Sequence, residues 1–119
     1  MASGSITQEY PTNAQTATRN TTNAPSGTCT YFKIGKKVFV HVADMQVAVT
    51  GHNDVYYTGL PNAAATTVFL LTSCSLGAWT KPLRVKVTTD GKILNHYYSL
   101  SEPIGQGNEL YGDIVYECT

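Results

Sequence analysis

Six polar or aromatic residues of this chain have the chemistry to bind a saccharide. They are His52, Asn53, Asp54, Tyr56, Tyr57 and Trp79. Sugar rings present apolar C–H faces surrounded by hydroxyl groups, so aromatic side chains beside polar donors and acceptors suit them. The first three residues suit a cation equally well, although a short polar stretch of this kind is also typical of a solvated turn. The three aromatic side chains have core or interface positions as their alternative.

The motifs of common enzyme classes are absent from the sequence. There is no GxSxG elbow, no Walker loop and no HExxH pair. Residues 105–107 begin a GxGxxG pattern that lacks its third glycine. His41 stands among valines, where an interior or interface histidine is expected rather than a base. Asp44 and Asp54 are the remaining acid–base candidates, but a glycosidase needs them at a fixed separation that a sequence does not reveal. We therefore expect no enzymatic activity.

Three cysteines, Cys29, Cys74 and Cys118, show no CxxC spacing. Small buried thiols are their expected state, because free cysteine is among the most buried residue types. One disulfide with one thiol left over is the alternative. No ligand pair has the short spacing of a structural zinc site, so neither a metal nor another cofactor is expected.

Composition indicates one domain with a weak electrostatic field. The chain has 119 residues, of which 42% are hydrophobic and only 13% are charged, with a formal net charge of zero. A neutral surface does not attract nucleic acid or an anionic membrane over long range. No apolar run approaches the ~20 residues of a membrane span. The first five residues, MASGS, lack the apolar core of a signal peptide and are interpreted as a tag or linker, and the chain as a possible fragment.

Strand signals follow one another along the chain from residue 29 onward. Expected strands are 30–34, 37–49, 55–58, 66–73, 82–88, 92–100 and 110–118. Glycine-containing turns at 35–36 and 90–91 predict hairpins, and a phase change near residues 43–44 predicts a bulge. Seven or eight strands without a confident helix predict an antiparallel β-sandwich or jelly roll. Residues 1–28 are polar and are expected to be a tag, linker and extended arm, with the sandwich in 29–119.

Two of the expected strands, 37–43 and 66–73, are apolar on both faces. Side chains alternate across a strand, so Val40 and Phe39 point in opposite directions. An antiparallel sandwich normally has one wet face, so the second apolar face requires a cover, such as a partner subunit. A charge introduced at Val40 or Leu70 is therefore expected to prevent folding or assembly.

Residues 31–40 read YFKIGKKVFV and resemble a hairpin, Y-x-K-I-G-x-x-V-x-V, of a known phage module. The module is the C-terminal, host-specificity part of tail-fibre and minor structural proteins of tailed bacteriophages. Residues 59–61 (GLP) and 112–116 (GDIVY) are similar to later parts of the same module, and the threonine-rich approach to residue 31 is similar too. The matches cover 28–119 in the right order.

This resemblance implies a small β-sandwich, commonly a homotrimer, at the tip of a tail fibre or baseplate of the virion. There it would recognise a host surface glycan or protein, attached to the rest of the fibre after assembly in the host cytoplasm. A trimer would also cover the two doubly apolar strands. The resemblance assigns no binding residue, because binding loops differ between such modules, and the cysteines are not part of its pattern.

Three other functions remain open at this stage. A structural domain that trimerises a fibre and binds nothing would have the same apolar faces. A carbohydrate-binding module of a secreted enzyme would be a monomer with a flat aromatic face. A hydrolase is disfavoured because the sequence offers no convincing nucleophile and base.

Overall fold

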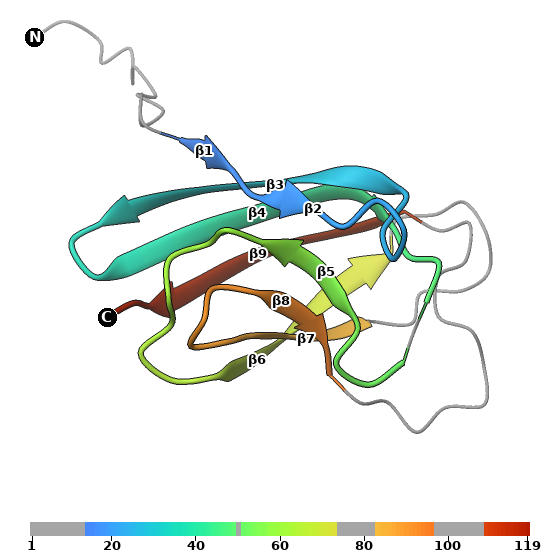
Figure 1. Ribbon diagram of the computed structural model, residues 1–119. Coiled ribbons are helices and arrows are strands. Elements are labelled where there is room, and N and C mark those ends of the chain that lie inside the picture. The colour runs from blue at the N-terminus through green and yellow to red at the C-terminus, as the bar shows by residue number, and fades with distance from the viewer. Residues whose placement is uncertain (1–13, 50, 74–82, 97–108) are drawn as a thin grey trace, which may run out of the picture.

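In the computed structural model, residues 14–49, 51–73, 83–96 and 109–119 are described, and they form nine β-strands (Figure 1). The strands are β1 (Gln15–Thr16), β2 (Thr18–Arg19), β3 (Ser26–Ile34), β4 (Lys37–Gln46), β5 (Val55–Thr58), β6 (Thr67–Ser73), β7 (Leu83–Val87), β8 (Ile93–Asn95) and β9 (Leu110–Glu117). Within these residues no helix has the length and apolarity that crossing a membrane requires.

The strands form one antiparallel sheet that folds into two layers. Their order is β1-β3-β4-β9-β6-β7-β8-β5-β2. β6 belongs to both layers, because its first five residues pair with β7 whereas Thr72 and Ser73 pair with β9. The predicted all-β antiparallel sandwich is confirmed. The two strands beyond the expected seven, β1 and β2, are only two residues long.

Residues 14–28 differ from the expected arm, because much of this segment is part of the sheet. β1 pairs with β3 and β2 pairs with β5, so the two ends of the strand order meet at one short segment. Ala17, between β1 and β2, is buried, and its N–H donates to the carbonyl of Cys29 at 2.8 Å. Ala24 is buried as well. Residues 1–13 lie outside the described part of the chain.

Both predicted hairpins are present. The turn between β3 and β4 has Gly35 at φ 60°, as the first central position of a type II′ turn requires. The turn between β7 and β8 is one residue longer than a two-residue hairpin. There the N–H of Gly91 donates to the carbonyl of Thr88 at 3.1 Å, and Gly91 has φ 76°. A left-handed glycine as the last loop residue is typical of three-residue hairpin loops.

The predicted bulge lies in β4. The register of β4 against β9 shifts between Val42 and Met45, and Asp44 has φ 54°. Before the bulge the even-numbered side chains point inward. The extra residue shifts the inward direction to odd positions, so that Met45 and Val47 are buried. β4 itself ends at Gln46 rather than at residue 49.

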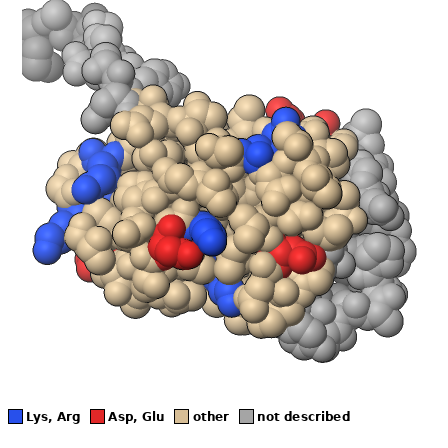
Figure 2. Space-filling model, in the orientation of Figure 1, with Lys and Arg blue, Asp and Glu red and all other residues tan. Residues whose placement is uncertain are grey.

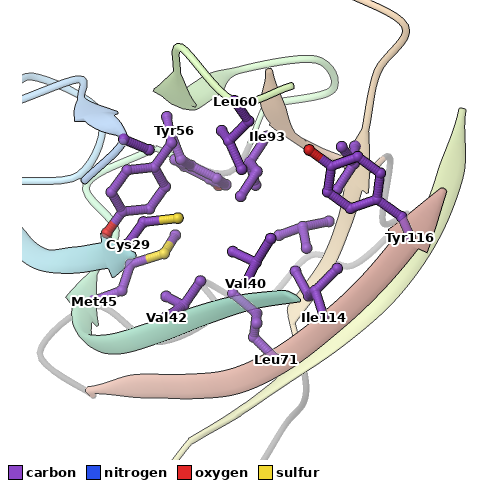
Figure 3. Close-up of a cluster of buried hydrophobic side chains, with 14 of the residues drawn as sticks. Cys29, Val40, Val42, Met45, Tyr56, Leu60, Leu71, Ile93, Ile114 and Tyr116 are labelled. Carbon is purple, nitrogen blue, oxygen red and sulfur yellow. The ribbon is translucent and has the colours of Figure 1, made fainter. Parts of the chain in front are cut away.

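The core lies between the two layers. In Figure 3, Val40, Val42 and Ile114 point from one layer toward Leu60 and Ile93 on the other side. The inward and outward faces of β4 agree with the predicted alternation, because its three valines are buried whereas Phe39 is only half-buried.

Two of the three cysteines are buried in this core as free thiols. They are Cys29 and Cys118. The expectation of buried thiols is confirmed for these two, and Cys74 lies outside the described residues. Burial raises the pKa of Cys29 from 9.0 to about 12, because the apolar surroundings disfavour the thiolate.

A glycine pair separates two contributions to the stability of the turns. A Cβ at position 91 would stand 2.1 Å from the carbonyl oxygen of Leu60, whereas a Cβ at position 35 would meet nothing within 4 Å. We expect Gly35→Ala to lower the free energy of unfolding by about 1 kcal/mol, the cost of a left-handed alanine. Gly91→Ala should cost about 3 kcal/mol because the collision is added. Urea titration measures both, and equal losses would contradict the close approach to Leu60.

Alkaline pH is expected to destabilise the fold through the buried thiol. An unfolded chain ionises Cys29 near pH 9.0, whereas the folded chain keeps the proton until about pH 12. The contribution of the Cys29 thiol to the free energy of unfolding is therefore complete below pH 9 and is lost as the pH rises above it. Urea midpoints measured from pH 7 to 10.5 should decline more in the unchanged chain than in Cys29→Ala. Equal pH dependence in the two chains would rule out this contribution.

Candidate functional site

The candidate ligand residues lie at one end of the domain. In the antiparallel order, β4, β6 and β8 end there and β5, β7 and β9 begin there. The turn 51–54 connects to the start of β5 at this end. His52, Asn53 and Asp54 all belong to it, so the structure brings these three predicted residues together. Trp79 lies outside the described residues.

The turn 51–54 is closed by its own hydrogen bonds. The N–H of Gly51 donates to the carboxylate of Asp54 at 2.6 Å, and the N–H of Asp54 donates to the carbonyl of Gly51 at 3.1 Å. Asn53 has φ 68°, a left-handed conformation that asparagine tolerates better than most residues. His52 and Asn53 are therefore presented at the surface, while Asp54 is half-buried and fixed by the turn.

A buried asparagine of β8 holds the turn against the sheet. Asn95 donates from Nδ2 to the carbonyl of Gly51 at 2.9 Å. Its backbone N–H donates to the carbonyl of Asp54 at 2.8 Å, and its carbonyl accepts the N–H of Asn53 at 2.9 Å. Three hydrogen bonds to one turn fix its backbone, so the exposed side chains stand on a rigid support. Sequence reasoning did not single out Asn95, because its partners are about 40 positions away.

Tyr56 and Tyr57 are not surface residues, which corrects the prediction that they contact a ligand. Both are fully buried, although neighbouring residues of a strand normally face opposite ways. The pairing of β5 with β8 shifts register between Val55 and Tyr57, and this irregularity allows both rings to enter the core. The hydroxyl of Tyr56 donates to the carbonyl of Val49 at 2.8 Å. Burial raises the pKa of both phenols.

His41 does not lie in the interior, one of its two expected places, and its expected place at an interface stays a prediction. Its side chain is exposed on the outer surface of β4, where Nδ1 lies 2.7 Å from the Asp113 carboxylate. Asp44, the other residue weighed as a catalytic acid, accepts a hydrogen bond from the hydroxyl of Tyr111. The same hydroxyl lies 2.9 Å from the carboxylate of Glu109. These bonds, first of all the one to Asp44, raise the pKa of Tyr111.

The outer surface of β3, β4 and β9 carries three rows of side chains that sequence reasoning did not assemble. We call these nine residues the hollow face. The rows, each crossing the three strands, are Thr30, His41 and Asp113; Phe32, Phe39 and Val115; and Ile34, Lys37 and Glu117. The middle row is apolar. One outer row contains the Lys37–Glu117 ion pair, 3.2 Å long, and the other contains the hydrogen-bonded pair of His41 and Asp113.

The hollow face contains a depression of about 390 Å³. Its lining includes the rings of Phe32 and Phe39, which are stacked with centroids 5.0 Å apart and planes inclined by 11°. Val115 and the His41–Asp113 pair border it, and Ala14 closes one side. The outward positions of β4 were recognisable from the sequence, but the depression depends on pairings between residues more than 70 positions apart.

A second exposed apolar patch lies on the outer surface of β6 and β7. We call it the β6–β7 patch. It consists of Val68 and Leu70 on β6, which are 45% and 55% exposed, and their cross-strand partners Lys86 and Arg84 on β7.

Figure 2 shows few charged side chains on the viewed face of the domain, in small separate groups. Among the described residues no cluster of three or more histidine, cysteine, aspartate or glutamate side chains is placed to hold a metal ion.

The support of the turn by Asn95 is testable. Asn95→Ala removes the donor to the carbonyl of Gly51, and we expect a loss of about 1–2 kcal/mol in unfolding free energy. The amide of Asn53 should exchange with solvent faster. Asn62→Ala, at an exposed loop position, serves as the control and should change neither quantity. Unchanged amide exchange in Asn95→Ala would show that the turn is rigid without this side chain.

Comparisons with known proteins identify a solved structure with a similar fold. No protein-family model matches the sequence, and no curated protein matches it. The structure is similar to the crystal structure of the head domain of the lactococcal phage bIL170, which is described in connection with a common fold of the receptor-binding domains of lactococcal phages. The TM-score is 0.65 with 13% sequence identity, and the match covers 93% of this chain and all of the phage domain. The resemblance to phage receptor-binding modules is thus confirmed at the level of the fold.

Proposed function

We propose that this protein is a receptor-binding module of a tailed bacteriophage, carried by a tail fibre or baseplate of the virion. It recognises a glycan on the host surface, works as a homotrimer and catalyses no reaction. The observation that carries the proposal is the fold, which the chain shares over 93% of its length with the head domain of phage bIL170.

The turn 51–54 supports a role in receptor contact. It presents an imidazole and an amide at one end of the domain, on a backbone fixed by Asn95. Such groups donate and accept hydrogen bonds with sugar hydroxyls at little entropic cost, because the turn is already ordered. The opposite end of the domain holds the β3–β4 hairpin and the C-terminus, where the N–H of Cys118 donates to the carbonyl of Lys36 at 2.9 Å.

The exposed apolar side chains support assembly. Ile34, Val68, Leu70 and Val115 are large apolar residues that the domain itself does not cover. Low total charge makes such a surface poorly soluble as a lone subunit. In a trimer each subunit makes a weak receptor contact, and avidity raises the strength of binding without any new contact.

A carbohydrate-binding module of another kind is the second candidate. The nearly parallel rings of Phe32 and Phe39 on an outer sheet surface favour it, because they resemble the flat aromatic face that such a module needs. A purely structural trimerisation domain is the third, and it would use the same apolar surfaces without binding any glycan.

A glycan array with purified protein, together with binding to whole bacterial cells, separates these candidates. We expect binding to a bacterial surface polysaccharide by a multimeric protein. A multimer that binds no glycan and no cell would favour the structural domain. A monomer that binds glycans through Phe32 and Phe39 would favour the carbohydrate-binding module.

His52→Ala is expected to weaken binding to the glycan identified by that array. The loss of one hydrogen bond, about 1.4 kcal/mol, corresponds to a tenfold weaker contact per subunit. Lys36→Ala, in the hairpin at the opposite end, is the matched control and should bind like the unchanged chain. Surface plasmon resonance on immobilised polysaccharide measures both. Equal affinity of the two variants would exclude the turn from the binding site.

A further inference from the structure

We infer that two different surfaces of the domain bind each other between copies of this chain: the hollow face of one copy receives the β6–β7 patch of the next. The inference rests on the homotrimer of the proposed function and specifies its interface. It is argued from the shape, the exposure and the charges of the two surfaces.

The hollow face has the anatomy of a receiving surface. Its centre is the apolar row of Phe32, Phe39 and Val115, and the depression lies over the two rings. The Lys37–Glu117 ion pair flanks this row on one side, and the hydrogen-bonded His41–Asp113 pair flanks it on the other. An apolar centre within a polar rim is the arrangement found at the core of protein–protein interfaces. The hydroxyl groups of a sugar would find few hydrogen-bonding partners over this centre, whereas an aliphatic side chain would fill it.

The β6–β7 patch has the matching chemistry. Val68 and Leu70 are two residues apart on one strand, so both side chains project from the same outer face. They are aliphatic and about half-exposed, which makes them suitable to enter a depression lined by aromatic rings. One contact between the two surfaces removes both exposed apolar areas from water at once, whereas a small ligand in the depression would leave Val68 and Leu70 uncovered.

The charges of the two surfaces are complementary. The β6–β7 patch carries Arg84 and Lys86 beside its two aliphatic residues. On the hollow face, Asp113 and Glu117 of β9 stand on either side of Val115, and their partners His41 and Lys37 stand beside them on β4. Bringing the patch onto β9 therefore places cations near carboxylates around an apolar contact. Such an arrangement fixes orientation and disfavours a placement of the patch cations over β4, where they would meet Lys37.

The geometry favours a ring over a face-to-face dimer. The two surfaces differ, so the contact is heterologous, and heterologous contacts close into rings when the rotation between copies fits. β9 and β6 are neighbours in the strand order, and β6 passes from one layer to the other between Leu71 and Thr72. The hollow face therefore lies on the outer surface of one layer and the β6–β7 patch on the outer surface of the other, and β6 connects the two layers.

Two variants with matched design test the inference by solution mass. Leu70→Asp places an acid in the patch, where it would face Asp113 and Glu117 of the next copy. Val115→Lys places a cation on the hollow face, where it would face Arg84 and Lys86. Light scattering should show the unchanged chain at three times the 12.9 kDa subunit mass and each variant as a monomer at the same concentration. Thr21→Glu, in the exposed turn after β2, should remain a trimer.

A mixture of the two variants identifies the interface as heterologous. Leu70→Asp retains an intact hollow face and Val115→Lys retains an intact β6–β7 patch, so the mixture should form a species of at least twice the subunit mass. If the hollow face bound its own copy instead, Leu70→Asp alone would stay associated, and that result would overturn the inference. A mixture that remains monomeric would overturn it as well.

Folding and receptor binding are followed separately. Circular dichroism should show the same spectrum for all chains, because both substituted residues are exposed. If either variant lacks that spectrum, Ile34→Lys and Val68→Asp replace the pair. A monomeric unchanged chain that still binds the host polysaccharide would end this inference and leave receptor binding standing. If the unchanged chain is a trimer that the substitutions disrupt as described, but it binds no receptor, this inference stands and receptor binding is contradicted.

Discussion

The closure of the sheet by one short segment is the constraint on which the rest of this structure depends. β1 and β2, separated by a single buried alanine, pair with β3 and β5, the two strands that would otherwise be free edges. Unpaired edge strands expose rows of N–H and C=O groups that invite uncontrolled pairing with other chains. The hydroxyl of Tyr31 strengthens this seam, because it lies within hydrogen-bond distance of the side-chain oxygen of Gln15, at 2.8 Å, and of the carbonyl of Gly59, at 3.1 Å.

Closure has a direct consequence for association. The segment pairs with residues 30–31 of β3 and 57–58 of β5, so copies of the domain have less open edge to which they could add strands. Side chains on the outer surfaces are the other means of association. The exposed residues Val68, Leu70 and Val115 lie on these surfaces rather than at an edge. The same closure leaves the strand ends as the places where loops can vary without disturbing the core.

Much of the fold followed from local patterns in the sequence. Alternation in β4 predicted which side chains enter the core, and the glycines at 35 and 91 predicted the hairpins, because both signals depend only on neighbouring residues. β1 and β2 escaped prediction because two-residue strands carry no periodicity and exist only through pairing with distant partners. The same reason explains the hollow face, whose rows join residues of β3, β4 and β9.

The candidate site was predictable only in part, and Tyr56 and Tyr57 show why. Their type and their place beside a polar turn indicated surface aromatics, but an irregularity in the pairing of β5 with β8 places both rings in the core. No local signal marks that irregularity. His52, Asn53 and Asp54 were placed correctly in a turn because their residue types favour turns, whereas the role of Asn95 as its support depends on tertiary contact.

The sequence identity to the phage bIL170 domain is only 13% over nearly the whole chain, and this low value has a physical explanation. Inward alternation and closure of the sheet restrict only the apolar character of core positions and the turn residues, so many sequences satisfy them. The exposed side chains of the turn 51–54 and of the hollow face are under no such restriction. A shared fold therefore transfers neither the receptor nor the binding residues from one domain to the other. If the chain binds a receptor as proposed, its specificity must come from its own exposed side chains, with the turn held by Asn95 as the first place to look.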